Sequence, residues 1–262
     1  MIFHEFGNKS LPHIVLIHGG GNSWWNYLRQ AQLLSDKYHV ILPTLDGHGE
    51  EYRNEYISTE ASAQEILKYI KSNCDGKVFA LGGVSLGGQI VIELLSLDRN
   101  IAQKAIIDGS ICIPQPKLAK ICVDIVKVFG KLMFNKFACK LQLSLMKKMY
   151  PSMAYPEEIE NYYMEDMPKI PIKTLVTIYQ TYMGEYTLKR SISESKSHAL
   201  YIYGEKEMKC VKESAKRFKQ MHPNCILYEV KDYNHGYLSV YLPFEWINLV
   251  NPFLEDTISP KY

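Results

Sequence analysis

The chain has no hydrophobic run long enough to cross a membrane and no paired cysteine motif. No window of its 262 residues reaches the roughly 18 apolar residues that a spanning helix needs. Its six cysteines are scattered without a C-x-x-C pair, so neither a zinc site nor a disulfide framework is indicated, and free thiols are expected. Residues 1–6 lack the positive stretch and long apolar stretch of a secretion signal, which predicts a cytoplasmic protein.

Neither sign of charge dominates the composition. Thirty Lys and Arg residues stand against 28 Asp and Glu residues, which leaves a net charge of +2. A nucleic-acid-binding surface normally needs a stronger basic excess, and no basic run with interleaved aromatic residues occurs. The length suits one substantial core with an insertion, and the sequence contains no internal repeat or low-complexity tract. We therefore expect a globular protein that does not bind nucleic acid.

The most informative motif is the pentapeptide 83–87, Gly-Val-Ser-Leu-Gly. It follows a short β-prone run at 77–81 and precedes a buried helical run at 86–95. A G-x-S-x-G sequence between a strand and a helix is typical of the nucleophile elbow of a serine hydrolase, because the tight turn needs small neighbours. This pattern makes Ser85 the candidate nucleophile.

A glycine-rich loop follows an earlier strand. The apolar run 13–17 leads into 18–24, His-Gly-Gly-Gly-Asn-Ser-Trp. Acyl transfer develops negative charge on the carbonyl oxygen, and fixed backbone N–H groups stabilise that charge. Taken alone, the segment is equally well explained as an ordinary turn. Beside the elbow, it predicts an oxyanion hole made by the N–H groups of Leu86 and of Gly20 or Gly21.

His235 is the candidate general base. It follows the probable strand 225–230, and a serine hydroxyl needs a neighbouring imidazole to take its proton. The other histidines are expected to be surface or structural residues. Among them, His18 and His48 lie in glycine-flanked loops, and we expect them to hydrogen-bond to neighbouring backbone rather than to transfer protons.

Strands and helices alternate along most of the chain, which predicts an α/β fold with a mostly parallel sheet and helices on both faces. We expect strands near 2–6, 13–18, 39–43, 77–83, 104–108, 199–203 and 225–230. We expect helices near 23–36, 57–72, 86–96, 208–221 and 237–254. Right-handed crossovers bring the carboxyl ends of parallel strands to one edge of the sheet, where ligands bind. The candidate residues follow predicted strands, so we expect them to meet at this edge.

The alternation stops between residues 110 and 198, where no convincing strand appears. A connection of that length needs structure of its own. Apolar residues recur at helical spacing over 117–149, 157–167 and 172–186, with lysines between them in the first stretch. This segment is therefore predicted to be a helical insertion above the carboxyl edge of the sheet.

The chain resembles the α/β-hydrolase superfamily, in the branch with a cap inserted between the two halves of the sheet. The resemblance covers nearly the whole length. It rests on the loop at 18–21, the loop Leu-Asp-Gly-His-Gly at 45–49, the elbow at Ser85, the sequence Gly-Glu-Lys-Glu at 204–207, and His235. It implies an α/β-hydrolase core formed by residues 1–109 and 199–262 and a helical cap formed by residues 110–198.

The resemblance also implies an acid that orients the histidine, and three carboxylates are candidates. Glu207 occupies the family position after the sixth strand of the main sheet, where aspartate is more usual, and it gives the order Ser85, Glu207, His235. Asp108 ends the strand 104–108, where some members place their acid instead. Glu205 is the third candidate. We predict Glu207 and keep Asp108 and Glu205 as alternatives.

These parts predict a serine hydrolase that needs no metal or organic cofactor. The expected reaction is hydrolysis of a small or medium carboxylic ester through an acyl-enzyme. A thioesterase, a lysophospholipase, a C–C bond hydrolase or a lyase on the same fold remain alternatives, as does a non-catalytic ligand-binding protein. The substrate pocket is expected under the cap, lined by apolar cap residues, Trp24 or Trp25, and Leu86.

Overall fold

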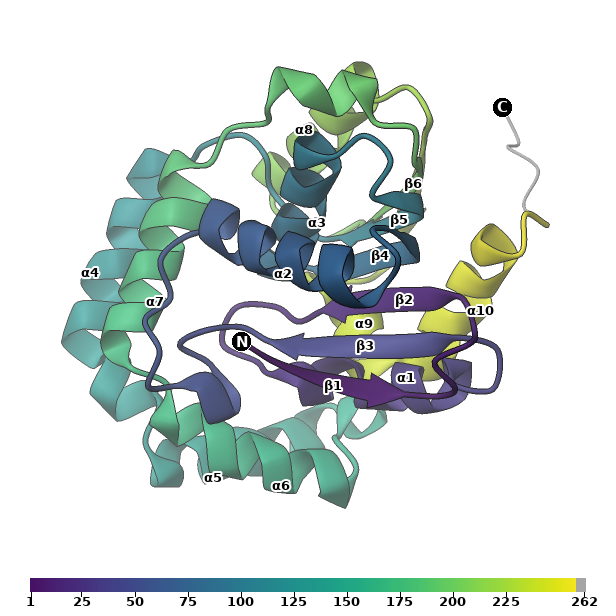
Figure 1. Ribbon diagram of the computed structural model, residues 1–262. Coiled ribbons are helices and arrows are strands. Elements are labelled where there is room, and N and C mark those ends of the chain that lie inside the picture. Colours follow the sequence, from purple (N-terminus) through teal and green to yellow (C-terminus); the bar gives the residue numbers. More distant parts are fainter. Residues whose placement is uncertain (258–262) are drawn as a thin grey trace.

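The computed structural model describes residues 1–257, which form a seven-stranded sheet in the order β1-β3-β2-β4-β5-β6-β7 (Figure 1). β1 pairs antiparallel with β3, and the other neighbouring strands are parallel. The predicted mostly parallel sheet is therefore confirmed. The strands are β1 (Ile2–Phe6), β2 (His13–Ile17), β3 (His39–Thr44), β4 (Val78–Val84), β5 (Ala102–Asp108), β6 (His198–Gly204) and β7 (Cys225–Val230).

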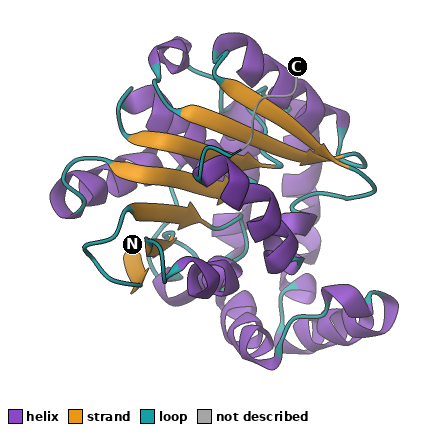
Figure 2. Cartoon of the chain, turned by 90° about the vertical axis from the view of Figure 1, so that its right-hand side faces the viewer, coloured by secondary structure: helices purple, strands orange, loops and turns teal. Residues whose placement is uncertain are grey.

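Helices cover both faces of the sheet, as Figure 2 shows. Alternate residues of a strand point to opposite faces, so Val15 and Ile17 of β2 join one buried cluster while Ile14 and Leu16 join another. The first cluster includes residues of α2 (Thr59–Asn73), α3 (Leu86–Leu97) and α8 (Lys209–Met221). The second includes residues of α1 (Leu28–Leu34), α9 (Tyr237–Tyr241) and α10 (Pro243–Leu254). This division into two apolar layers confirms the predicted α/β architecture.

Two predicted helices are interrupted. The C-terminal stretch 237–254 divides into α9 and α10 because Pro243 has no N–H to donate to the preceding turn and instead begins the second helix. The stretch 23–36 opens as the short 3₁₀ helix η1 (Trp24–Tyr27) before α1 begins. A second short 3₁₀ helix, η2 (Gly49–Glu51), follows β3.

The segment between β5 and β6 is helical and contains no described strand. The long stretch 117–149 is not one helix: it breaks after Phe134, and the side chain of Asn135 accepts a hydrogen bond from the N–H of Ala138 to begin a second. The helices are α4 (Pro116–Met133), α5 (Lys136–Met149), η3 (Pro151–Met153), α6 (Glu157–Asp166), η4 (Met167–Lys169), α7 (Ile172–Ile178), the π-helix η5 (Tyr179–Glu185) and η6 (Arg190–Glu194).

The helices between β5 and β6 contribute most of the residues of a third, small apolar cluster. Residues of α4 to α7 pack there with Trp25 and Leu28, which belong to the N-terminal half of the chain. Figure 1 shows α4 outermost, with α7 between α4 and the sheet. The segment between β5 and β6 therefore adds a layer of helices beyond the carboxyl edge of the sheet, toward which β3 points in Figure 1. The division of the chain into a core and a separate cap stays a prediction.

Candidate active site

The predicted elbow is a sharp turn between β4 and α3. Ser85 has a φ of +54°, a conformation that a residue with a side chain adopts only at a cost. A Cβ atom on Gly83 would lie 2.4 Å from the backbone of Gly87, and one on Gly87 would lie 2.1 Å from the carbonyl oxygen of Ile17. Both glycines are therefore required by close backbone approach. The turn leaves the Ser85 side chain half-buried at the carboxyl edge of the sheet.

Three of the predicted side chains meet in a chain of hydrogen bonds. His235 Nε2 lies 3.0 Å from Ser85 Oγ. On the other side of the ring, His235 Nδ1 lies 3.0 and 3.1 Å from the two carboxylate oxygens of Glu207. These are normal hydrogen-bond distances. Ser85 follows β4, Glu207 follows β6 and His235 follows β7, so the parallel sheet brings together residues up to 150 positions apart.

The surroundings of His235 favour its protonated form. Burial of part of the ring lowers its pKa, but the hydrogen bond and negative charge of Glu207 outweigh burial, with a further contribution from Asp108, so the pKa is raised. The Glu207 side chain is fully buried, whereas 43% of the His235 side chain is exposed. The pair can therefore stabilise an imidazolium while the ring stays accessible from outside.

The two alternative acids have other partners. Asp108 is buried at the end of β5 and accepts a hydrogen bond from the Ser239 hydroxyl. Burial raises the pKa of Asp108 to about 6, with Glu207 adding to the rise and with Ser239 and His235 opposing it. Glu205 is exposed and accepts a hydrogen bond from the backbone N–H of Asp232 at 3.0 Å. Glu207 is thus the carboxylate found at the ring.

The proposed oxyanion loop is held in place by buried side chains. The Leu45 N–H donates to His18 Nε2 at 3.1 Å, so the ring proton lies on Nδ1, which donates to the Gly19 carbonyl at 2.8 Å. Burial and the neighbouring His48 hold the pKa of His18 well below its usual value. On the other side, Asn26 Oδ1 accepts from the Gly19 N–H at 3.4 Å. The His18 ring therefore hydrogen-bonds to neighbouring backbone groups, as predicted.

The three residues predicted to form the oxyanion hole lie around the elbow. Leu86 is the first residue of α3, so its N–H has no partner within that helix. Gly20 is exposed, and a Cβ atom there would lie 3.4 Å from Ile178 and 3.7 Å from the Leu86 side chain. Gly21 has a φ of +86°, which favours glycine. Their role in binding an oxyanion stays a prediction.

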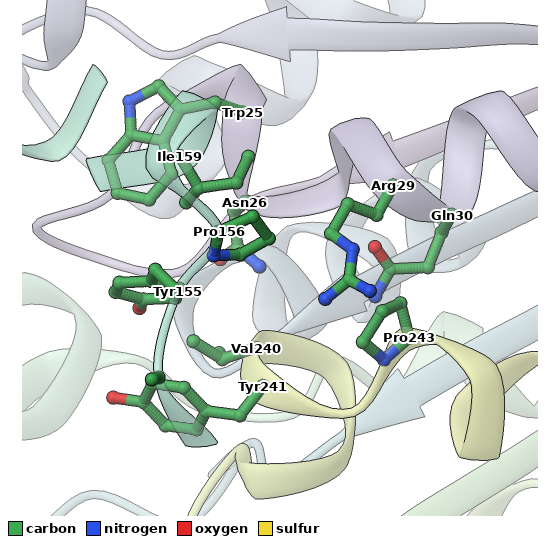
Figure 3. Close-up of a pocket in the computed structure, with 11 residues that line it drawn as sticks. Trp25, Asn26, Arg29, Gln30, Tyr155, Pro156, Ile159, Val240, Tyr241 and Pro243 are labelled. Carbon is green, nitrogen blue, oxygen red and sulfur yellow. The ribbon is translucent and has the colours of Figure 1, made fainter. Parts of the chain in front are cut away.

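The two candidate pocket tryptophans pack against other aromatic side chains. Trp24 stacks on His4 with ring centres 4.2 Å apart. Trp25 is buried and donates its indole N–H to Asp166 Oδ2 at 2.8 Å. It also lines a cavity of about 10 Å³ between Tyr155 and η1, shown in Figure 3, which is room for about one water molecule. The hydrogen bond from Trp25 to Asp166 joins η1 to α6. A substrate-binding role for either tryptophan stays a prediction.

The structure also places two residues at the site that the sequence did not single out. The hydroxyl of Tyr182, on η5, lies 3.4 Å from Ser85 Oγ, and burial raises the pKa of this tyrosine. The Tyr182 carbonyl accepts a hydrogen bond from Gln89 Nε2 at 3.0 Å, which ties η5 to α3. No local pattern distinguishes this tyrosine from the other 18 in the chain.

The second residue is Gly109, which directly follows Asp108. Its φ is +57°, and a Cβ atom there would lie 2.8 Å from Glu207 Oε1 and 3.2 Å from His235 Nδ1. A side chain at this position would therefore push between the acid and the imidazole. In the sequence, Gly109 is visible only as a glycine that follows a predicted strand. Many ordinary turns have a glycine at such a position.

For the ester hydrolysis expected from the sequence, we predict that Gly109→Ala lowers kcat/KM at least tenfold, because the methyl group displaces Glu207 from His235. The matched control is Gly76→Ala, which has a similar φ of +81° but whose Cβ atom would meet only Lys71, at 3.8 Å. Each substitution should cost about 1 kcal/mol or more of unfolding free energy through backbone strain. Urea denaturation and ester turnover measure both effects. Equal turnover by the two variants would contradict this account of Gly109.

Comparisons with known proteins agree with the fold. The chain is 24% identical over 257 residues to Lipase 1 of Psychrobacter immobilis, covering 90% of this chain and 74% of the lipase. It superposes on a thermophilic esterase of Thermogutta terrifontis with a TM-score of 0.76 at 16% identity, covering 98% and 94% of the two chains. The carboxylesterase CesB of Bacillus subtilis gives a TM-score of 0.72 at 18% identity, covering 98% and 88%.

Fold and relatives together define an enzyme of the α/β-hydrolase superfamily, and the resemblance seen in the sequence is confirmed. Within it, the chain belongs to the serine aminopeptidase family, S33, whose model matches residues 9–239. The two structural neighbours named above are 16% and 18% identical to this chain, so they establish the fold alone.

Proposed function

We propose that the protein is a carboxylic ester hydrolase that uses Ser85 as its nucleophile and forms an acyl-enzyme. The observation that carries this proposal is the continuous hydrogen-bonded series Glu207–His235–Ser85 on an elbow turn. A serine hydroxyl with a base at 3.0 Å, itself oriented by a buried carboxylate, has the arrangement required for nucleophilic catalysis. The esterase and lipase relatives support an ester as the substrate.

In the proposed reaction, Ser85 Oγ attacks the carbonyl carbon while its proton passes to His235 Nε2. Glu207 keeps the ring proton on Nδ1 and stabilises the imidazolium. The N–H of Leu86 and that of Gly20 or Gly21 bind the oxygen as it becomes negative. His235 then returns its proton to the leaving alcohol, the C–O bond breaks, and water releases the acid from Ser85 by the same steps.

We also propose that residues 110–198 act as a cap over this site. The contact between Tyr182 and Ser85 Oγ and the approach of Ile178 to Gly20 bring two parts of the segment to the nucleophile. Exclusion of water by these side chains would strengthen the hydrogen bonds to the oxyanion. Tyr182 is also in a position to contact the acyl group or leaving group of a bound substrate.

The proposal is tested with a fluorophosphonate probe and a graded substrate series. We expect the probe to label wild-type protein, and p-nitrophenyl esters of short and medium acyl chains to be hydrolysed with a preference that falls for long chains. An acyl thioester, a lysophospholipid and an aminoacyl anilide in the same series test the alternative substrate classes. Absence of both labelling and turnover would reject the serine hydrolase mechanism and favour a ligand-binding role.

A further inference from the structure

Helices α4 and α5 carry an apolar face that the rest of the described chain leaves uncovered. Of the 18 large hydrophobic side chains found exposed, 11 lie between residues 116 and 150, so the exposure is concentrated in one segment. Phe137 is 77% exposed, Val128 71% and Leu132 68%. We call this set the α4–α5 face: Ile121, Ile125, Val128, Phe129, Leu132, Met133, Phe137, Leu141, Leu145, Met149 and Tyr150.

The α4–α5 face is distinct from the face with which the same helices pack. On α4 the buried positions are Ala119, Val123, Val126 and Gly130, and the exposed apolar positions repeat at spacings of three and four on the opposite side. On α5 the exposed stripe follows the spacing of Phe137, Leu141, Leu145 and Met149, and the buried positions are Cys139 and Leu143. Each helix therefore has two apolar sides.

An ordinary surface helix of this protein looks different. On α8 the exposed side chains are charged or polar, and the apolar ones face the core. Figure 1 places α4 as the outermost helix, on the side of the molecule away from α10. A concentration of exposed apolar side chains in one segment of the chain is typical of a site of interaction with a protein or a membrane.

The net charge of α4 and α5 indicates which kind of partner the α4–α5 face binds. Residues 116–149 contain eight lysines and one acidic residue, Asp124, for a net charge of +7, whereas the remainder of the chain carries −5. Lys127 and Lys131 lie beside the apolar stripe of α4, and Lys136 and Lys140 lie beside that of α5. Two further lysines of these helices are in ion pairs within the chain, Lys120 with Asp124 at 3.2 Å and Lys147 with Glu160 at 2.7 Å. Long lysine stems can cover apolar surface while their ammonium groups reach a layer of anionic head groups.

We propose that the α4–α5 face binds the surface of a bilayer that contains anionic phospholipid, with its apolar side chains in the head-group region and its lysines against the phosphates. Helices that expose an apolar side flanked by lysines bind membrane interfaces in this way. The mode proposed is attachment to one leaflet through these exposed side chains. None of the helices described over residues 1–257 is long and apolar enough to cross a membrane. An isologous dimer through this face would instead set two lysine-rich surfaces against each other.

Vesicle co-sedimentation tests the proposal on the full chain, with binding rather than ester turnover as the readout. We expect binding to vesicles of phosphatidylcholine mixed with phosphatidylglycerol, weaker binding to phosphatidylcholine alone, and loss of binding as salt is raised. The double variant Leu132→Ser/Phe137→Ser should bind the mixed vesicles at least about tenfold more weakly. Its control is Leu33→Ser/Phe244→Ser, which changes exposed apolar residues on α1 and α10 and should bind like the wild type.

A second pair of variants tests whether vesicle binding depends on the charge of α4 and α5 or only on the net charge of the protein. Lys131→Glu/Lys140→Glu should abolish binding, whereas Lys209→Glu/Lys216→Glu on α8, with the same change in net charge, should retain most of it. All four variants change exposed side chains, and retained hydrolysis of a soluble ester shows that each is folded. Wild-type-like binding by the α4–α5 variants, or no binding by the wild type, overturns the proposal. So does a dimer that Leu132→Ser/Phe137→Ser dissociates in the absence of vesicle binding.

Discussion

Replacement of Ser85 by alanine is expected to lower kcat for ester hydrolysis by roughly 10⁴- to 10⁶-fold, because no other group in the site supplies the attacking oxygen. The substitution removes one half-buried oxygen and no core contact, so the thermal unfolding midpoint should stay close to that of the wild type. Fluorophosphonate labelling should be lost completely. Turnover is measured with the ester that the substrate series identifies as best.

A matched control uses a serine on α3, the helix that follows the elbow. Ser96 is half-buried on α3, and its hydroxyl donates to the Ile92 carbonyl at 2.9 Å, away from His235. Ser96→Ala should keep full labelling and turnover. Retention of more than a few per cent of wild-type activity by Ser85→Ala would show that another group is the nucleophile. A contaminating esterase is excluded when the residual activity does not co-purify with the variant.

The sequence could predict those parts of the site that have either a local motif or a position directly after a predicted strand. Ser85 lies in a motif whose glycines are required by the backbone itself, since a Cβ atom at Gly83 or Gly87 would collide with main-chain atoms. His235 and Glu207 have no such motif, but each follows a strand of a parallel sheet. Topology therefore predicts the edge at which they meet, even though the chain separates Ser85 and His235 by 150 positions.

Tyr182 and Gly109 could not be predicted because their importance arises only from contacts across the fold. Tyr182 lies within the π-helix η5, a rare conformation that the apolar spacing of 172–186 does not indicate, and from there its hydroxyl reaches Ser85.

The apolar spacing of residues 117–149 correctly predicted helices. It could not show that half of their apolar residues face outward, because periodicity alone does not distinguish a stripe that packs on the protein from one that faces its surroundings.

The choice among the three carboxylates is tested by Glu207→Gln, which we expect to lower kcat by roughly 10²- to 10⁴-fold with little change in KM. The amide keeps the shape of the side chain but can donate to His235 Nδ1, which favours the tautomer with its proton on Nε2, facing Ser85. It also removes the charge that stabilises the imidazolium. Asp108→Asn serves as the comparison, because Asp108 is buried nearby but is hydrogen-bonded to Ser239.

The pH dependence of kcat/KM distinguishes a role of Glu207 in catalysis from a role in the stability of the fold. His235 acts as a base only when neutral, so kcat/KM of the wild type should rise with pH and level off above its pKa, which Glu207 raises above the usual value of about 6.5. Without the carboxylate, the protonated ring is less stable, so the kcat/KM profile of Glu207→Gln should shift to lower pH. Asp108→Asn should leave kcat within about tenfold of the wild type and shift the profile less, because its contribution to the pKa of His235 is the smaller one. A large loss in Asp108→Asn with near-normal activity and an unshifted profile in Glu207→Gln would instead assign the catalytic acid to the end of β5.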